Sequence, residues 1–413
     1  MKTLVLLFLV CALGHAQWER VPEIPARRVV YSLFAFQDTL YGGTDSLVYV
    51  GVKQGTQWSA GISPFTGADG VSSFLKIRNV LVVGTFQSGI YTSTDDGFSW
   101  KPFDDGLSGL GSLSIGGLLV RRDSLIAGTL GEGVFATPVD LLHPWSQWGD
   151  SLPDYEGENV LRIGMIGNTV LAGAGANGYM FRYDDAQPWW NPIDINTPRR
   201  VGQTVSGMAS SDSVVVAGTS KGVYRSTDEG RTWIKTGIIL PPQENGTFNL
   251  YYGSTFFTAI NTIASATILI SSDQGQTWSL PIVLPVPYIY DLAGVGDTLY
   301  LATAGGLWRS PLSRLLTSAR RITTPPSVFG LWQNYPNPFN PQTNFQFSIP
   351  NFGLVNLVVY DLLGREVATV VNEMKQAGTY TVQWDASRLA SGAYFYRLQA
   401  GSFSVTKKLI LLR

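Results

Sequence analysis

Short stretches that alternate apolar and polar residues follow one another along most of the chain, separated by glycine-rich turns. In one unit these stretches are 205–210, 213–218, 222–226 and 232–238. Alternation with a period of two residues is typical of β-strands that bury one face. Helical periodicity is nearly absent, so the pattern predicts an all-β protein.

One octapeptide, S-x-D-x-G-x-[ST]-W, occurs at 93–100, 226–233 and 271–278, each time beside short apolar runs. This arrangement predicts a hairpin loop, in which the Asp accepts backbone hydrogen bonds, the Gly allows a positive φ and the Trp anchors the returning strand. The expected structural residues are Ser93, Asp95, Gly97, Trp100, Ser226, Asp228, Gly230, Trp233, Ser271, Asp273, Gly275 and Trp278.

The octapeptide resembles the Asp-box, also called the bacterial neuraminidase repeat. The resemblance implies a β-propeller in which these loops are structural and lie away from the ligand-binding face.

A longer repeat surrounds the octapeptide and reads apolar-apolar-Gly-Thr, then Gly-apolar-aromatic, as at 82–91, 126–135 and 216–224. Each unit holds four alternating runs, which is the content of a propeller blade. We therefore expect a seven-bladed β-propeller over 17–312, with its last sheet completed by a strand near the N-terminus; six or eight blades are the alternatives. Tryptophans end the units about 40 to 48 residues apart, at Trp18, Trp58, Trp100, Trp148, Trp190, Trp233 and Trp278.

The first 16 residues are typical of a secretory signal peptide, with Lys2 before an apolar run and Ala16 at the expected cut.

Because the chain's single cysteine lies within this segment and one histidine follows it, we expect no metal site, disulfide or Ser-His-Asp triad. A G-x-G-x-x-G run at 173–178 precedes a strand pattern rather than a helix, so no dinucleotide cofactor is expected. The apolar run is too short for a membrane span, and no later run is long enough. A net charge of −1 gives no electrostatic case for nucleic acid.

The repeat ends near residue 312, and a Pro- and Arg-containing segment at 313–332 predicts an exposed linker. Alternating runs over 333–413 then predict a small immunoglobulin-like β-sandwich. This module resembles the type A C-terminal sorting domain of the type IX secretion system of Bacteroidetes. The residues that carry the resemblance include Asn334, Pro336, Asn337, Pro338, Asp361, Gly364, Gly392, Lys407 and Lys408.

The resemblance implies Sec export, handling of 333–413 by the type IX secretion machinery and passage through the outer membrane. Removal of the sorting domain would follow, with release of the protein or its attachment to surface lipopolysaccharide. The expected location is therefore outside the cell or on the outer-membrane surface.

A ligand of such a propeller is expected in the central channel or on the face opposite the octapeptide loops. Two Arg-Arg pairs among few charged residues suggest an anionic ligand; solvated loop charges are the alternative. The expected ligand-binding residues are Arg27, Arg28, Tyr155, Glu156, Arg199 and Arg200.

Three functions compete. A non-catalytic module that binds a carbohydrate or a protein is favoured, because no catalytic set is recognisable. A sialidase-like glycoside hydrolase is the first alternative, but 21–25 lacks the arginine expected of the sialidase motif near the start. A structural or adhesive surface protein is the second.

Overall fold

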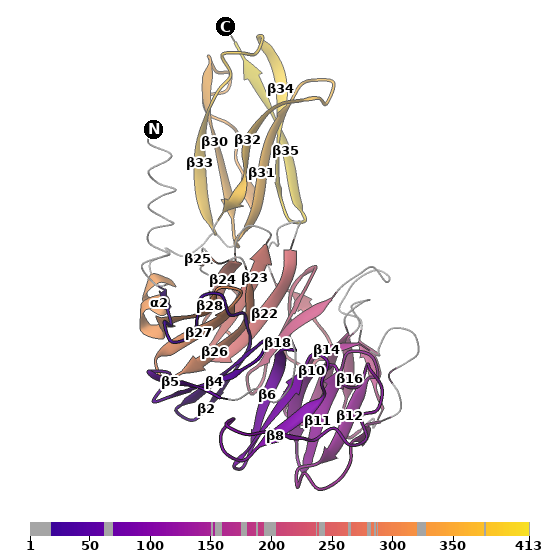
Figure 1. Cartoon of the computed structure of the whole chain (residues 1–413). Helices are drawn as coiled ribbons and strands as arrows, with labels where there is room; N and C mark the ends of the chain where they lie inside the picture. Colours follow the sequence, from indigo (N-terminus) through magenta and orange to yellow (C-terminus); the bar gives the residue numbers. More distant parts are fainter. Residues whose placement is uncertain are drawn as a thin grey trace. The chain divides into compact units, whose positions relative to one another are not determined.

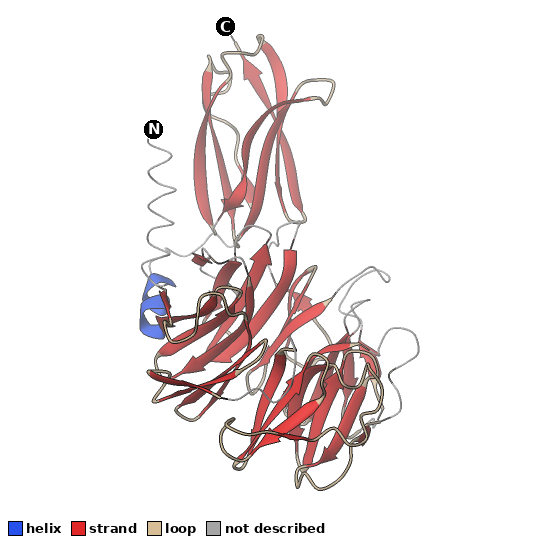
Figure 2. Ribbon diagram, viewed as in Figure 1, coloured by secondary structure: helices blue, strands red, loops and turns tan. Residues whose placement is uncertain are grey.

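In the computed structural model, the regular secondary structure of the described residues is almost entirely β-strand (Figures 1 and 2). The expected signal peptide, 1–16, lies outside the described residues. The structure describes residues 18–61, 69–149, 152, 159–174, 180–186, 189–193, 204–236, 238, 244–262, 266–278, 282–284, 286, 288–319, 328–375 and 377–412.

The described residues up to 311 form seven antiparallel sheets of four strands each. Six of these sheets consist of four consecutive strands, so each one is a meander whose neighbours in sequence are paired in space. Their strands are β2 (Val30–Phe36), β3 (Thr39–Thr44), β4 (Val48–Val52) and β5 (Gln57–Ala60); β6 (Val71–Ile77), β7 (Val80–Thr85), β8 (Ile90–Ser93) and β9 (Lys101–Pro102); β10 (Ile115–Arg121), β11 (Ser124–Thr129), β12 (Val134–Pro138) and β13 (Ser146–Gln147); β14 (Val160–Ile166), β15 (Thr169–Ala174), β16 (Met180–Tyr183) and β17 (Asn191–Ile193); β18 (Val205–Ser210), β19 (Val215–Thr219), β20 (Gly222–Ser226) and β21 (Ile234–Lys235); β22 (Glu244–Tyr252), β23 (Thr255–Thr262), β24 (Ala266–Ser271) and β25 (Ile282–Leu284).

The remaining sheet joins the two ends of this region. It contains β26 (Ile289–Val295), β27 (Thr298–Thr303) and β28 (Gly306–Pro311), and β1 (Glu19–Arg20) pairs with β28. The first strands of the seven sheets contact one another in a closed cycle, from β2 through β6, β10, β14, β18, β22 and β26 back to β2. The sheets therefore form a ring, and apolar clusters fill the space between neighbours, as where Tyr41 and Val48 pack with Phe74.

The Gly-Thr repeat ends the second strand of a sheet, and each of its two residues has a physical role there. A Cβ atom on Gly43 would lie 2.6 Å from the Cβ of Val71 in the next sheet, and one on Gly84 would lie 2.5 Å from Ile115 Cγ2. The glycine therefore sets how closely two sheets approach. The threonine hydroxyl then closes the following turn, as where Thr85 Oγ1 donates to the Gly89 carbonyl at 3.1 Å.

The C-terminal module is built from two sheets that share one hydrophobic core. Phe345 and Phe347 of one sheet and Val355, Leu357 and Leu398 of the other are fully buried in that core. The first sheet has β29 (Gly330–Leu331), β30 (Gln342–Ile349) and β33 (Gly378–Asp385), and the second has β32 (Glu366–Lys375), β31 (Gly353–Tyr360), β34 (Gly392–Ala400) and β35 (Phe403–Leu411).

The expected linker differs from the structure at both of its ends. Residues 312–319 form α2 (Leu312–Ala319), and 330–331 belong to β29. The helix forms because Leu312 and Leu315, three residues apart, are both buried. Asp297 caps its first turn, accepting bonds from Ser313 N at 3.1 Å and Ser313 Oγ at 2.8 Å. A helix this short carries too little periodicity to stand out in the sequence.

We predict that Gly43→Ala destabilises residues 17–413, whereas Gly42→Ala has a much smaller effect. A methyl group at Gly43 overlaps Val71, but one at Gly42 has Leu33 Cδ2 as its nearest neighbour, at 3.7 Å. Overpacking of this kind costs about 1–3 kcal/mol. Scanning calorimetry measures both variants, and equal transition temperatures would show that the sheets can move apart.

Candidate functional site

The first strand of every sheet in the ring has the same irregularity near its start, a β-bulge. A β-bulge follows the first paired residue of each strand, as between Val30 and Ser32, Val71 and Ser73, and Ile289 and Asp291. The other sheets repeat it after Ile115, Val160, Val205 and Glu244. Because a bulge re-aims the side chains beside it, the ring gains a layer of redirected positions at one end of its first strands.

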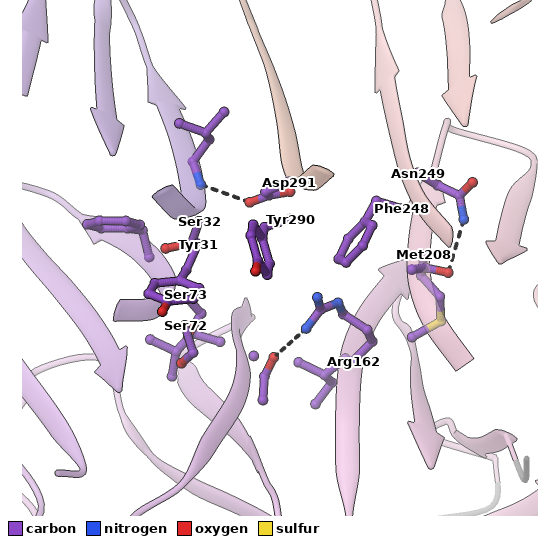
Figure 3. A pocket seen from close by; sticks show the side chains of 17 residues that line it. Tyr31, Ser32, Ser72, Ser73, Arg162, Met208, Phe248, Asn249, Tyr290 and Asp291 are labelled. Carbon is purple, nitrogen blue, oxygen red and sulfur yellow. Dashed lines mark hydrogen bonds between the residues drawn. The ribbon is translucent and has the colours of Figure 1, made fainter. Parts of the chain in front are cut away.

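These positions line a cavity of about 180 Å³ that all seven first strands help to form (Figure 3). Small residues keep it open, since glycine occupies the position after the bulge in β10 and β18. The lining residues that carry polar or aromatic groups are Tyr31, Ser32, Ser72, Ser73, Phe74, Arg162, Phe248, Asn249, Tyr290 and Asp291.

Arg162, from β14, is held by backbone oxygens. Its Nε donates to Ser206 O at 2.9 Å, its Nη1 donates to Leu161 O at 2.9 Å, and the guanidinium lies 5.3 Å from the centre of the Phe248 ring. Burial lowers the pKa of this group, although an arginine stays charged at any ordinary pH. Its Nη2 makes no hydrogen bond with a described residue, so one fixed donor remains for a ligand.

Asp291, from β26, lies on a different side of the cavity from Arg162 (Figure 3). Its Oδ2 accepts from Leu33 N at 2.8 Å, and its Oδ1 accepts from Leu292 N at 2.9 Å. Desolvation nevertheless raises the pKa of this carboxyl to about 6, against the lowering effect of these bonds and of Arg162. The cavity thus holds one fixed cation and one fixed carboxylate that do not pair directly.

An aromatic cluster leads from the cavity to the surface. Tyr31 makes edge contacts with Tyr290 at 5.2 Å and with Phe86 at 5.4 Å between ring centres, and Tyr290 also packs against Tyr288 at 4.7 Å. Phe86 is 36% exposed, so the cluster reaches solvent. It lies where the first strands begin and the second strands end, which is the face that the sequence predicts for a ligand.

The structure describes only two of the six residues predicted for ligand binding. Arg27 is exposed, and Arg28 is engaged by Asp45 at 2.8 Å and Ser46 at 2.7 Å. Neither lines the cavity. The other predicted residues, Tyr155, Glu156, Arg199 and Arg200, lie outside the described residues.

Sequence reasoning missed Arg162 and Asp291, which the structure places in the cavity. A usable signal exists, because both residues stand two positions after the buried branched residue that begins a unit, Val160 or Ile289. The same position is Ser32, Ser73, Gly117 or Gly207 in other units. Aligning the units on that residue singles out the two charges.

The octapeptide loops share one set of internal hydrogen bonds. In the second loop, Ser226 Oγ donates to Asp228 at 2.7 Å and accepts from Gly230 N at 3.0 Å, while Thr232 donates to Asp228 from its amide and hydroxyl. The first loop repeats this pattern with Ser93, Asp95, Gly97 and Ser99, and the third repeats its first two bonds with Ser271, Asp273 and Gly275. Trp233 and Trp278 are buried, and Trp100 is partly buried.

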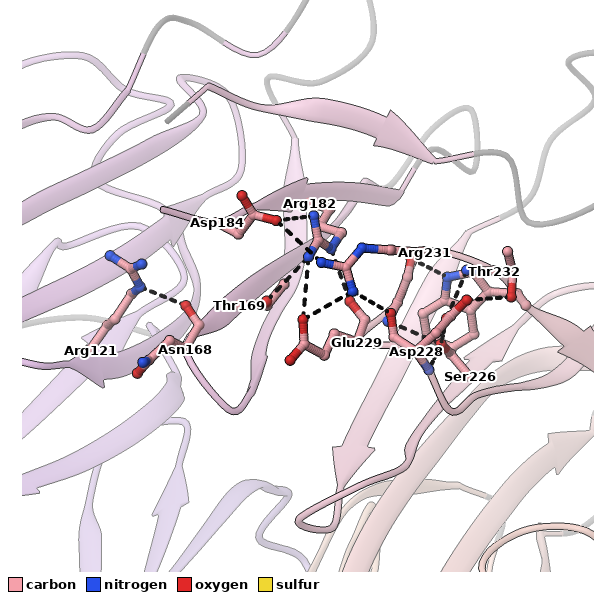
Figure 4. Close-up of polar contacts among 12 residues, drawn as sticks. Arg121, Asn168, Thr169, Arg182, Asp184, Ser226, Asp228, Glu229, Arg231 and Thr232 are labelled. Atoms are coloured by element: carbon pink, nitrogen blue, oxygen red, sulfur yellow. Dashed lines mark hydrogen bonds and ion pairs between the residues drawn. The ribbon is translucent and has the colours of Figure 1, made fainter. Parts of the chain in front are cut away.

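Each of these three loops also links its own sheet to the preceding sheet of the ring (Figure 4). The residue between the Asp and the Gly has a positive φ in all three loops, which turns its backbone outward. Arg182 Nε donates to Glu229 O at 3.0 Å, and Arg225 Nε donates to Gln274 O at 2.6 Å. In the first loop Asp96 takes the equivalent role, bound by Tyr41 and Lys76. The carboxylates of the loops thus bond within their own turn or to a neighbouring strand.

The residues of the sorting resemblance meet at two places within the C-terminal module. Asn334 is buried and donates to Pro336 O at 3.1 Å and Thr343 Oγ1 at 3.0 Å, while Asn337 Oδ1 accepts from Ile410 N at 2.9 Å. Gly392 pairs with Leu411, so it lies beside the same end of β35. At the second place Asp361 closes a turn through Arg365, with Gly364 at a φ of 78°. The proline-rich motif, with Pro336 and Pro338, therefore holds the last strand, in which Lys407 is half-buried and Lys408 exposed.

Comparison with known families decides where the chain travels. Residues 333–412 match the family model of the secretion system C-terminal sorting domain. The chain is exported by the type IX secretion system. It reaches the cell surface or the outside of the cell. No curated protein matches the chain by sequence.

Solved structures similar to this chain are β-propellers. The extracellular domain of a hybrid two-component system of B. thetaiotaomicron has a TM-score of 0.55 at 13% identity and covers 96% of this chain and 57% of its own. Virginiamycin B lyase from Staphylococcus aureus has a TM-score of 0.55 at 12% identity, over 71% of this chain and 97% of its own. PorZ, a surface component of the type IX secretion system of Porphyromonas gingivalis, has a TM-score of 0.50 at 14% identity, over 94% of this chain and 60% of its own. At these identities the likeness shows the fold alone.

Within the described part of the chain, no helix has the length and apolar character needed to cross a membrane.

We predict that Asp228→Ala lowers the free energy of unfolding by about 1–3 kcal/mol, because several donors lose a charged acceptor. Its hydrogen bonds hold the pKa of Asp228 below the ordinary value, although desolvation acts in the opposite direction. The carboxylate therefore stabilises the fold above the unfolded pKa of about 3.9, and this contribution is lost as the pH falls through the folded pKa. Urea denaturation of wild type and Asp228→Ala at pH 7 and pH 3 tests this, and a difference that does not shrink at pH 3 would contradict it.

Asp291 has the opposite pH dependence. Its folded pKa of about 6 exceeds the unfolded value of about 3.9, so its contribution to stability is fully present below pH 3.9 and is lost as the pH rises through 6. We expect Asp291→Asn to gain about 2 kcal/mol of stability relative to wild type between pH 4 and pH 7. Thermal unfolding at the two pH values measures this, and a constant difference would rule out the raised pKa.

Proposed function

We propose that the chain is a surface or secreted seven-bladed Asp-box β-propeller that binds a carbohydrate or protein ligand without catalysis. Residues 17–312 form the propeller, each four-stranded sheet being one blade. Residues 333–413 form an immunoglobulin-like sandwich that serves as the type IX sorting domain, and 1–16 form the signal peptide. After export the sorting domain is removed, and the protein is released or attached to lipopolysaccharide.

One observation carries this proposal: the cavity on the ring combines rigid polar groups with an aromatic approach from the surface. Arg162 and Asp291 are both positioned by backbone groups, so little conformational freedom is lost when a ligand binds. Concave sites with a few well-placed polar groups among aromatic side chains are typical of small-molecule and glycan recognition. The cavity lies at the ligand-facing end of the blades rather than at the octapeptide loops.

The lining chemistry supports binding rather than hydrolysis. Glycoside hydrolysis by the usual route needs a pair of carboxyl groups flanking the scissile bond. Among the described residues that line the cavity, Asp291 is the sole carboxylate and Arg162 the sole cation. Neither the paired carboxylates of common hydrolases nor the separate arginines of sialidases are assembled by these residues.

The proposal predicts saturable binding without turnover. Residues 17–413 are incubated with an array of glycans and with candidate surface proteins, and bound ligand and product masses are measured together. Binding with unchanged ligand masses is expected. Release of a sugar that depends on Asp291 or Glu156 would establish the hydrolase instead, and the absence of any ligand would favour a structural role.

A further inference from the structure

We infer that the ring cavity binds a single uncharged sugar ring at the end of a glycan, between Arg162 and Asp291, and that the next unit of the glycan contacts Tyr31 and Phe86. This inference rests on the proposed function, because it names the ligand class of the same site. The inference places the ligand in the cavity rather than at the Arg27-Arg28 loop, because Asp45 already pairs with Arg28.

The charges of the lining decide against a ligand that carries a net charge. Arg162 would attract an anion and Asp291 would repel it, and the reverse holds for a cation, so neither sign gains from the cavity as a whole. A hydroxyl group donates one hydrogen bond and accepts others. An uncharged ring with several hydroxyls can therefore donate to Asp291 and accept from Arg162 Nη2 at the same time.

Two further groups suit the same ligand. The hydroxyls of Tyr31 and Tyr290 make no hydrogen bond with a described residue, and burial raises the pKa of both, so they remain neutral donors at any ordinary pH. The Phe248 ring lies against the Arg162 guanidinium in the cavity wall. Polar groups at two sides and aromatic rings between them match a sugar, which has hydroxyls around its edge and C–H groups on its faces.

Size limits the occupant to one ring. A cavity of about 180 Å³ is smaller than the roughly 300–1,000 Å³ of pockets that enclose larger ligands. The rest of a glycan must therefore leave the cavity. The Tyr31–Phe86 edge contact gives it an aromatic surface on the way out, and Phe86 is the exposed member of that pair.

The test measures binding of residues 17–413 to an array of neutral and acidic oligosaccharides, followed by competition with the free terminal monosaccharide. Tyr290→Phe and Tyr31→Phe each delete one hydroxyl that has no partner among the described residues, so folding should be unaffected. Tyr251→Phe is the matched control, because Tyr251 also makes no hydrogen bond with a described residue and does not line the cavity. Circular dichroism checks that all variants fold.

We expect binding of a neutral glycan that is displaced by its own terminal monosaccharide. Tyr290→Phe and Tyr31→Phe should each weaken it by about 3- to 10-fold, the value of one hydrogen bond, and Tyr251→Phe should leave it unchanged. Phe86→Ala should weaken the oligosaccharide but not the monosaccharide.

Glycan binding that ignores the cavity variants would overturn the inference and leave the proposed function intact. A preference for acidic glycans would overturn it as well. Binding of a protein but of no glycan would also overturn the inference and leave the proposed function intact. A chain that binds neither a glycan nor a protein would overturn the proposed function as well.

Discussion

The close approach of one sheet to the next at a glycine governs the architecture of the ring. Where Gly43 meets Val71 and Gly84 meets Ile115, a side chain in place of hydrogen would force neighbouring sheets apart. The same contact recurs at Gly128 against Val160 and at Gly173 against Val205. At these four junctions the contact is made by the residue that begins the first strand of the next sheet, directly before the β-bulge that borders the cavity.

This geometry separates structural chemistry from ligand chemistry. The acidic residues of the octapeptide loops are consumed by turn closure and by links to the preceding sheet, as Asp228 and Glu229 illustrate. The charges of the cavity, in contrast, are anchored to backbone groups and retain binding capacity toward the interior. Asp228 therefore serves the turn in which it stands, whereas Asp291 borders the cavity at the start of its strand.

Much of the fold was predictable from the sequence, because period-two alternation, turn residues and a repeated glycine are local signals. The loop bonds of Asp95 and Asp228 follow from the same local chemistry. The cavity could not be predicted from the sequence, because Arg162 and Asp291 are 129 residues apart and line the same cavity only once the ring has formed. Each charge is a single polar position in an otherwise ordinary buried strand, and it stands out only when the units are aligned on Val160 and Ile289. The α2 helix was missed for a related reason: its cap, Asp297, lies in the turn between β26 and β27, 15 residues before Leu312.

The pairing of β1 with β28 has a consequence for the timing of assembly. Glu19 and its partner Arg309 are 290 residues apart, so the last sheet stays incomplete until nearly the whole ring has been delivered to one compartment. Until β28 arrives, β1 has no partner strand and the ring keeps an open edge, the kind of surface that recruits strands from other chains. A chain whose first and last strands complete the same sheet therefore loses its open edges only after both ends have reached the same compartment.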